Sequence, residues 1–243
     1  MKDLISTTST TPSVQPPSVE QAYLTYLRTP KWDEFKQDSR KPLRSNTIRE
    51  MIKACQLEDP LLSRQHLDSI QIALDQNQKV WVWSDQHFGH KNIIRYTDRP
   101  FDSVESMNEA MFQNYRQVVG DDDWVIFGGD LAFFDPKLID QRFQSLPGRK
   151  ILILGNHEFN HTHYTRFECM ASCHLAASFK IIREGEVWDL WVTHLPIDAH
   201  LLPPRTLNLH GHIHEKVRDG HLHVNMSVEH LNYQPVLLQS LIR

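Results

Sequence analysis

Residues 151–158 read ILILGNHE, in which four apolar residues are followed by a glycine, an amide, an imidazole and a carboxylate. The apolar run is too short for a typical helix and lies between a Pro-Gly pair at 147–148 and the glycine. It therefore predicts a β-strand that is covered on both faces. Ligands of open α/β sheets bind beyond the carboxyl ends of the strands. Asn156, His157 and Glu158 are therefore expected to belong to a functional site.

The composition of the chain sets wide limits on its class. It has 243 residues, 40% of them hydrophobic, which is enough for one large domain or a medium domain with an extension. No apolar run approaches membrane-spanning length, and the polar start does not resemble a signal peptide. The scattered Cys55, Cys169 and Cys173 predict buried thiols and a cytoplasmic location. A net charge of −4 gives no overall attraction for nucleic acid.

The N-terminal third is expected to differ from the rest of the chain. Residues 1–17, rich in Ser, Thr and Pro, predict a flexible tail. Residues 18–78 predict a helical extension whose first helix begins at a capping box of Ser18 and Gln21 and ends before Pro30. Basic residues between 36 and 53 are interpreted as a solvated helix face, with a patch that contacts phosphate or caps the substrate as the alternative. Two further helices are expected at 45–55 and 61–74.

Residues 79–243 are expected to form the main domain, because strand-like and helical patterns alternate from Lys79 onward. The alternation predicts an α/β layered fold with at least partly parallel strands. Helices are expected from 102 or 103 to 118 and at 136–143. Strands are expected at 80–83, 124–127, 150–154, 187–193 and 206–209, with a closing strand pair at 221–228 and 235–242.

Five of these strand ends carry side chains that bind metal ions. In an extended segment residues i and i+2 point the same way, so each Asp-x-His or His-x-His pair is expected to face one cavity. Glycines at 89, 129, 155 and 211 let the backbone approach that cavity. Three oxygen ligands and four imidazoles suit two ions that share a bridging carboxylate better than one tetrahedral ion. The candidate ligands are Asp85, His87, Asp130, Asn156, His194, His212 and His214.

Each of these motifs alone is also typical of an ordinary turn or surface pair. Their joint occurrence at successive strand ends is what indicates a metal site. The ordered set resembles the signature of the calcineurin-like metallophosphoesterase superfamily over residues 79–243. The wider phrase that includes Arg99-Pro100-Phe101 is similar to a small bacterial and phage branch of it.

The resemblance implies a four-layer α-β-β-α sandwich of two mixed sheets flanked by helices, with the N-terminal helical extension outside it. It also implies two divalent metal ions, of Mn, Fe, Ni or Zn. One ion would be held by Asp85, His87, Asp130 and His214, and the other by Asp130, Asn156, His194 and His212.

His157 corresponds to the superfamily's catalytic histidine, which donates to the scissile phosphate or protonates the leaving oxygen. Glu158 is expected to orient His157. A helix starting at Gly89 is expected to direct its amides at the phosphate. Further substrate contacts are expected from His90, Asn92 and Arg95.

The predicted function is metal-dependent hydrolysis of phosphoester bonds, with a hydroxide shared by two ions as the nucleophile. A phosphodiesterase acting on nucleotides or nucleic acid is favoured over a phosphomonoesterase on small phosphates. Protein phosphatase activity is not expected, because the sequence after Gly129-Asp130 lacks the Asp-Arg-Gly element of protein phosphatases. Two other classes stay open: a non-catalytic scaffold, and a nucleic-acid-binding regulator that uses residues 40–53. The expected partner is the phosphoester substrate and not a membrane; the oligomeric state is not predicted.

Overall fold

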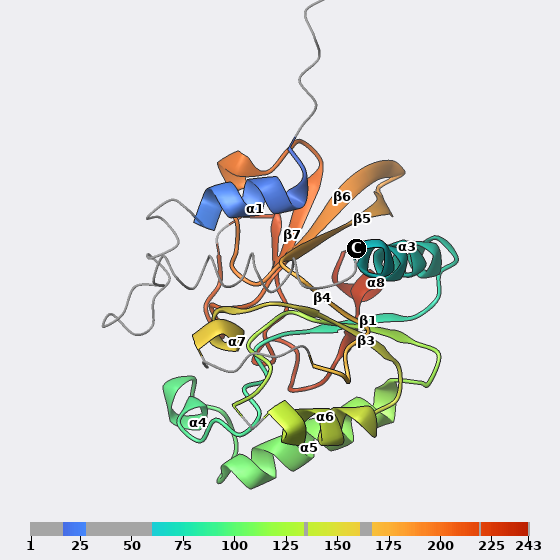
Figure 1. Cartoon of the computed structure of the whole chain (residues 1–243). Coiled ribbons are helices and arrows are strands. Elements are labelled where there is room, and N and C mark those ends of the chain that lie inside the picture. Colours follow the sequence, from blue (N-terminus) through green and yellow to red (C-terminus); the bar gives the residue numbers. More distant parts are fainter. Residues whose placement is uncertain (1–16, 28–59, 134–135, 161–166, 219, 243) are drawn as a thin grey trace, which may run out of the picture.

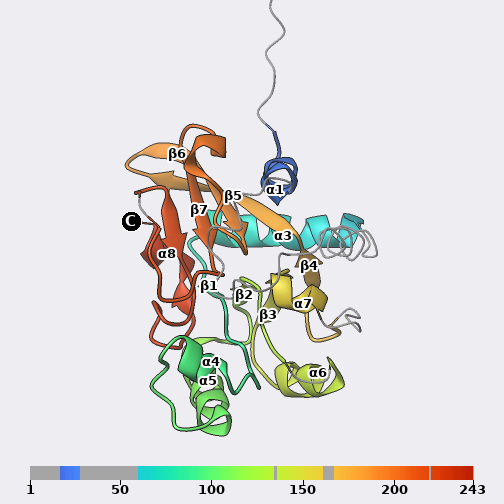
Figure 2. The same cartoon turned by 90° about the vertical axis from the view of Figure 1, so that its left-hand side faces the viewer.

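The computed structural model describes residues 17–27, 60–133, 136–160, 167–218 and 220–242. Two β-sheets face each other, with helices on their outer sides (Figure 1). The view in Figure 2 shows the layers in side view, with α1 above one sheet and α5 and α6 below the other. This arrangement of two mixed sheets flanked by helices confirms the predicted fold class.

The first sheet has the order β4-β3-β2-β1-β9. Its centre consists of short strands that are buried almost throughout, which is why they read as continuous apolar runs. All neighbours in this sheet are parallel except β9, which is antiparallel to β1. The strands are β1 (Val80–Trp83), β2 (Trp124–Phe127), β3 (Arg149–Ile153), β4 (Ser172–His174) and β9 (Val236–Leu237).

The second sheet has the order β5-β6-β7-β8. Its first two strands form an antiparallel hairpin, and the others are parallel. The strands are β5 (Ala176–Arg183), β6 (Glu186–Thr193), β7 (Thr206–His210) and β8 (His223–Asn225).

The predicted closing strand pair was wrong. β8 pairs with β7 in the second sheet, whereas β9 pairs with β1 in the first, and residues after β9 form helix α8 (Leu238–Leu241). Two short apolar runs close together in sequence look alike whether they pair with each other or with the edges of different sheets. Pattern alone therefore does not identify the partner strand.

Two helices cover the outer side of the first sheet, α5 (Val104–Val118) and α6 (Pro136–Gln144). Ser103 caps α5 in a reciprocal capping box with Ser106, and Met107, Met111 and Tyr115 form its buried side. The short helices α4 (Ile93–Tyr96) and α7 (Asn156–Asn160) and the 3-10 turn η2 (Ala199–Leu201) follow strands β1, β3 and β6.

The described part of the N-terminal region contributes two helices. In α1 (Val19–Leu27), Ser18 and Gln21 form the predicted capping box, with bonds of 3.2 and 3.3 Å. The apolar side of α1 is buried over the second sheet. Helix α3 (Pro60–Asp75) contacts β4 and β5, and the Gln71 amide bonds both backbone groups of Lys180 on β5. The predicted tail, the helix at 45–55 and the basic stretch lie outside the described residues.

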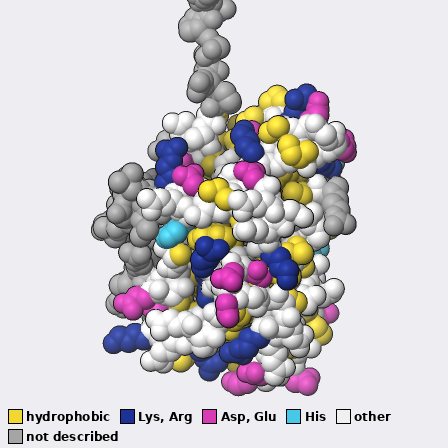
Figure 3. Space-filling view, turned by 90° about the vertical axis from the view of Figure 1, so that its right-hand side faces the viewer, with side chains coloured by type: hydrophobic (Ala, Val, Ile, Leu, Met, Phe, Trp, Pro, Cys, Tyr) yellow, Lys and Arg dark blue, Asp and Glu magenta, His cyan; other side chains and the backbone are white. Residues whose placement is uncertain are grey.

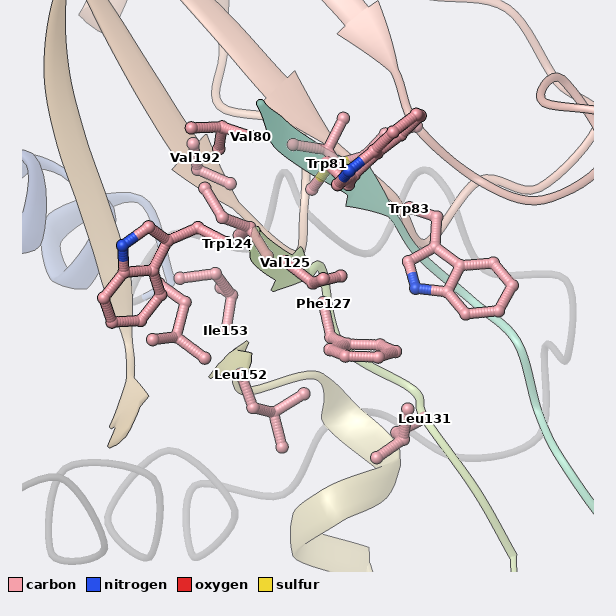
Figure 4. Packing of buried hydrophobic residues seen from close by; sticks show 14 of the residues in the cluster. Val80, Trp81, Trp83, Trp124, Val125, Phe127, Leu131, Leu152, Ile153 and Val192 are labelled. Carbon is pink, nitrogen blue, oxygen red and sulfur yellow. The ribbon is translucent and has the colours of Figure 1, made fainter. Parts of the chain in front are cut away.

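The main core lies between the sheets and under α5 and α6. Figure 4 shows side chains of β1, β2 and β3 packed together with Val192 of β6, which belongs to the other sheet. The Trp83 ring lies 5.7 Å from those of Tyr115 and Phe127. Burial of one such aromatic side chain stabilises the fold by about 1.5–3 kcal/mol. The tightly packed core therefore fixes the positions of the strand ends.

The surface in Figure 3 carries acidic and basic side chains intermixed, so that face has no large field of one sign. Among the described residues, no helix combines the length and apolarity needed to cross a bilayer.

Candidate metal centre

The predicted ligands lie together at the carboxyl ends of five strands. The donor atoms of Asp85, His87 and His214 lie within 4.8 Å of one another, and those of Asp130, His194 and His212 do the same. A third group, which consists of His87, Asp130 and His157, overlaps both regions. The third group therefore links the other two, because it shares His87 with the first and Asp130 with the second.

The backbone at these positions differs from the extended geometry expected for the i and i+2 pairs. Five of the candidate ligands have positive φ angles, a conformation that residues other than glycine rarely adopt. The expectation of two extended pairs was therefore wrong, and a series of left-handed turns brings the side chains together instead. Such conformations cost energy and concentrate at functional sites. The angles are 60° at Asp85, 51° at His87, 53° at Asp130, 71° at His212 and 51° at His214.

Two glycines allow these turns to pack against one another. A Cβ atom on Gly211 would collide with the Asp85 carboxylate, and one on Gly155 would collide with the Asp130 carboxylate. Glycine is therefore required at both positions by the close approach of a neighbouring chain segment.

The Asp85 carboxylate is fixed from two sides. It accepts hydrogen bonds of 3.0 Å from the His212 backbone N–H and from the Ser227 hydroxyl. Because His212 belongs to the second sheet and Asp85 to the first, these bonds also hold the two groups of donors in register.

The imidazole of His194 directs its Nε2 atom at the site. Its Nδ1 lies 2.8 Å from the Gly128 carbonyl, which can only accept, so Nδ1 carries the proton. The other nitrogen, Nε2, lies 3.1 Å from the Asn156 Oδ1 and 3.4 Å from the Asp130 Oδ2. Nε2 therefore faces two oxygen acceptors, which need positive charge beside them, either a proton on Nε2 or a bound metal ion. A divalent ion fits this requirement once Nε2 is deprotonated.

Without a bound ion, the electrostatics of the site favour the proton on His194. Burial opposes protonation of His194, but the Asp130 carboxylate outweighs it and raises the pKa of His194 to about 10. Burial also opposes ionisation of Asp130, but the nearby imidazoles outweigh it and hold its pKa well below the usual range. The site therefore stabilises a negative carboxylate that attracts a cation.

His87 is a buried imidazole whose ring nitrogens both lack a hydrogen-bond partner among the described residues. Burial lowers its pKa well below the usual range, so the ring is neutral and has a free lone pair. Its Nε2 lies 3.7 Å from the Asp130 Oδ2. Leaving a buried polar atom unpaired costs about 1–3 kcal/mol, and a metal ion bound to one ring nitrogen would remove this cost for that atom.

His157 is partly accessible, with 32% of its side chain exposed. Its backbone N–H donates to the Asp130 Oδ1 over 2.9 Å, and its Nε2 lies 3.8 Å from Oδ2 of the same carboxylate. The ring centre lies 5.3 Å from that of His87. The imidazole therefore borders the cluster and is partly exposed to solvent.

Glu158 contacts backbone groups of the turns around the centre. Its carboxylate accepts hydrogen bonds from the backbone N–H groups of Asp130, Leu131 and Gly155, at 3.0, 2.7 and 2.6 Å. Burial, with Asp130 adding to it, raises its pKa to about 7. Glu158 thus joins the turns after β2 and β3, and it positions Asp130 through the backbone.

The expected helix at Gly89 was also wrong. Helix α4 begins at Ile93, and the Gly89 N–H donates to the Asn108 side chain over 3.1 Å instead of facing a phosphate. Gly89 has a φ of 80°, which turns the chain before a helix can start.

The three residues that were expected to contact the substrate lie in different surroundings. The His90 ring stacks on Phe133 at 4.2 Å and lies 5.4 Å from His87, beside the centre. Arg95 lies over the exposed Tyr96 ring, and Asn92 is the exposed N-cap of α4. Only His90 of the three contacts a residue of the metal cluster among the interactions described.

An ion pair that the sequence did not reveal supports the His214 side of the centre. Arg99 donates to the backbone carbonyls of Asp85 and Gln86, at 2.7 and 2.8 Å, and pairs with Glu229 at 2.6 Å. The same Glu229 oxygen lies 3.1 Å from the His214 Nδ1. Such a carboxylate holds the Nδ1 proton and leaves Nε2 as the metal-binding atom. Arg99 was noticed within its Arg-Pro-Phe phrase, but nothing in the sequence indicated Glu229.

A second contact missed from the sequence comes from the N-terminal region. The Leu195 backbone N–H donates to the Tyr23 hydroxyl over 3.1 Å, and both residues are fully buried. Leu195 directly follows the candidate ligand His194, so helix α1 contacts the turn that carries this residue.

The carboxylates and imidazoles at the strand ends of a two-sheet sandwich define this molecule as a metal-binding α/β protein. The chain belongs to the calcineurin-like phosphoesterase family, whose sequence profile matches residues 78–239. The resemblance seen in the sequence motifs is thereby confirmed.

Relatives of this chain are similar to it over most of their own length. An uncharacterised protein of Methanocaldococcus jannaschii is 31% identical over 175 residues, which cover 68% of this chain and 90% of that protein. The Gene 66 protein of Mycobacterium phage L5 is 28% identical over 177 residues, which cover 59% and 82%. A crystal structure of a protein of unknown function from Aquifex aeolicus has a TM-score of 0.48 and 23% identity, covering 67% of this chain and 96% of that one.

Proposed function

We propose that this protein hydrolyses phosphodiesters with the help of two divalent metal ions bound at the strand ends. The observation that carries the proposal is the pair of donor groups that a third group links through His87 and Asp130. Two ions about 3.5–4 Å apart that share a carboxylate are the usual arrangement for displacement at phosphorus.

The donors divide between the ions as the superfamily resemblance implies. The residues that would hold the first ion are Asp85, His87, Asp130 and His214, and those that would hold the second are Asp130, Asn156, His194 and His212. When bound, such ions supply a hydroxide nucleophile at neutral pH and neutralise charge on the phosphoryl oxygens. Their combination of carboxylate, amide and imidazole ligands suits Mn, Fe, Ni or Zn.

His157 would assist departure of the leaving group. Its imidazole borders the cluster, is one-third exposed, and is held by its own backbone bond to Asp130. From that place it can donate a proton or a hydrogen bond to the oxygen of the leaving alkoxide.

Aromatic side chains near the metal centre favour a phosphodiester substrate over a phosphomonoester substrate. A diester has one negative charge and two organic groups, whereas a monoester dianion needs more cationic donors. His90, Phe133 and His157 present rings around His87, and the guanidinium of Arg99 is already bonded to backbone carbonyls and to Glu229. Nucleotides or nucleic acid, whose bases stack on aromatic rings, are the substrate class we favour.

The test compares bis(p-nitrophenyl) phosphate with p-nitrophenyl phosphate, using protein stripped of metal and then supplied with Mn²⁺, Fe²⁺, Ni²⁺ or Zn²⁺. We expect metal-restored diester cleavage that falls by about 100-fold in His157→Ala, with the two bound ions retained. A preference for the monoester would redirect the proposal to small phosphates. No turnover by protein that holds two ions would instead support the non-catalytic scaffold.

A further inference from the structure

Helix α4 lies beside the metal centre and presents an aromatic ring to solvent. It follows β1 as α7 follows β3. Because these strands run parallel, both short helices lie at the edge of the sheet that carries the candidate ligands (Figure 1). Tyr96, the last residue of α4, is 56% exposed. A single exposed aromatic ring is common on protein surfaces, so its surroundings decide whether it has a function.

The rest of the helix fixes the direction of Tyr96. Ile93 is buried in the main core. Thr97, one turn later on the same side, is also buried, and its backbone N–H and its hydroxyl both donate to the Ile93 carbonyl over 3.0 Å. The buried side of this turn therefore holds Tyr96 outward. A ring on such a fixed support loses little conformational entropy when it binds a ligand.

A row of ring contacts connects Tyr96 with the metal centre. The Tyr96 ring centre lies 6.2 Å from that of His90, in an edge-on arrangement at 75°. His90 in turn stacks on Phe133 and lies 5.4 Å from the candidate ligand His87. The Phe133 ring lies 4.9 Å from that of His157. Aromatic surface therefore extends from the proposed reaction centre through His90 to the exposed ring.

Two exposed cations lie on the same segment of the chain. Lys91 and Arg95 form no ion pair with a carboxylate among the described residues. The Arg95 guanidinium lies over the Tyr96 ring, 5.7 Å from its centre. Asp98 is the acidic residue of the segment 89–98, which is therefore net positive although the chain has a net charge of −4. Cations beside an aromatic ring are the combination with which proteins bind single-stranded nucleic acid.

We propose that Tyr96, with Lys91 and Arg95, binds the nucleotide next to the one whose phosphodiester is cleaved, so that the substrate is a single-stranded nucleic acid. The inference rests on the proposed phosphodiesterase function and names its substrate. A mononucleotide at the centre would place its base near His90 and Phe133, so contact with Tyr96 requires a further nucleotide along a strand. A duplex would keep that base stacked and paired, whereas an unpaired strand leaves it free to stack on a protein ring.

The test measures kcat and KM of the metal-loaded full chain for a short fluorescent single-stranded oligonucleotide and for bis(p-nitrophenyl) phosphate. In Tyr96→Ala, kcat/KM for the oligonucleotide should fall at least about tenfold more than for the small diester, through a higher KM, because the base loses the ring on which it stacks. Tyr96→Phe keeps the ring and should retain most of the affinity. Lys91→Gln and Arg95→Gln should each make the oligonucleotide KM less dependent on salt.

The matched control is Arg116→Gln. Arg116 is also exposed and lies over an aromatic ring, that of Phe112. It belongs to the last turn of α5, which precedes β2, so it lies at the opposite edge of the sheet from the candidate ligands. This variant should behave like the unaltered protein with both substrates.

Equal losses on the two substrates in Tyr96→Ala would show a general effect on the centre and overturn the proposal. A loss of the same size with the p-nitrophenyl diester of thymidylate would assign Tyr96 to a mononucleotide substrate instead. Cleavage of the small diester without cleavage of the oligonucleotide would end this inference and leave the proposed function standing.

A binding measurement separates the inference from turnover. Fluorescence anisotropy of the labelled oligonucleotide with His157→Ala protein needs no cleavage, and adding Tyr96→Ala to that protein should weaken binding by about tenfold. Equal binding with and without the tyrosine ring would overturn the inference, whether or not the small diester is hydrolysed.

Discussion

Asp130 is the residue on which most contacts of the metal centre depend. Its carboxylate lies within 4 Å of nitrogens of His87, His157 and His194, and it accepts the backbone N–H of His157. The residue is almost completely buried, with 2% of its surface exposed. Its substitution therefore tests the centre most directly.

Asp130→Asn keeps the shape of the side chain and removes its charge. We expect it to lose at least one of two bound ions and to lower metal-dependent diester hydrolysis by at least about 100-fold, because a neutral amide cannot bridge two cations. Metal analysis and hydrolysis rates measure both effects. The exposed Asp102→Asn is the matched control, and equal metal content in the two variants would contradict the assignment.

A substitution of Glu229 is a second single-residue test of the metal centre. Glu229→Gln should weaken binding of one ion by about 10–100-fold, because the His214 Nδ1 loses the carboxylate that holds its proton. Isothermal titration with Mn²⁺ measures the change. The neighbouring exposed Glu215→Gln should bind both ions normally. An equal effect of the two substitutions would show that total charge, not the contact with His214, matters.

Among the elements, helix α1 connects the N-terminal region to a ligand turn. The sequence allowed its capping box and its buried side to be predicted, because both arise from spacing within one helix. The contact of Tyr23 with Leu195 joins residues 172 positions apart, and no local pattern contains that information.

Tyr23→Phe should lower the free energy of unfolding by about 1–3 kcal/mol, since the buried Leu195 N–H is left without its acceptor. Urea denaturation measures this loss. We also expect weaker metal binding on the His194 side, which titration of the metal-stripped variant detects. Tyr96→Phe, at an exposed ring, is the control and should change neither quantity.

The strands show where prediction from sequence succeeded and where it did not. β1, β2 and β3 were recognised because each is a short apolar run buried on both faces. β5 was missed although its buried and exposed residues alternate from Ala177 to Ile182, a signal that a search for period two would have found. β4 consists of Ser172, Cys173 and His174, which no propensity marks as a strand.

The site was predictable in composition but not in geometry. The types and order of ligands follow from the motifs, whereas the left-handed turns that aim them do not, because non-glycine residues rarely adopt such angles. Arg99 and Glu229 lie 130 positions apart, so their pairing is also invisible to local reasoning.

For the whole molecule, buried histidines make stability depend on pH. His174 is buried beside the Ser172 hydroxyl, and burial lowers its pKa to about 4, from an ordinary value near 6.5. Between these values the unfolded chain binds more protons than the folded one, so stability rises with pH and is lost as the pH falls from about 6.5 toward 4. The contribution of this single group amounts to at most about 3 kcal/mol.

His174→Gln should therefore flatten the dependence of stability on pH below 6.5. Denaturant unfolding of the metal-free protein at a series of pH values compares the slopes of the two proteins. The exposed His221→Gln serves as the reference and should keep the slope of the unaltered protein. Parallel slopes for His174→Gln and the unaltered protein would assign acid sensitivity to other groups.

The donor atoms of the centre are divided between the two sheets, with Asp85, His87 and Asp130 following strands of the first and His194, His212 and His214 following strands of the second. Each half of the sandwich is therefore an incomplete chelator. An ion bound by both halves would add cohesion across the plane where they meet, and slippage along that plane would separate the donors. We therefore expect the supply of divalent metal to help keep the sandwich closed, by mass action rather than by additional packing.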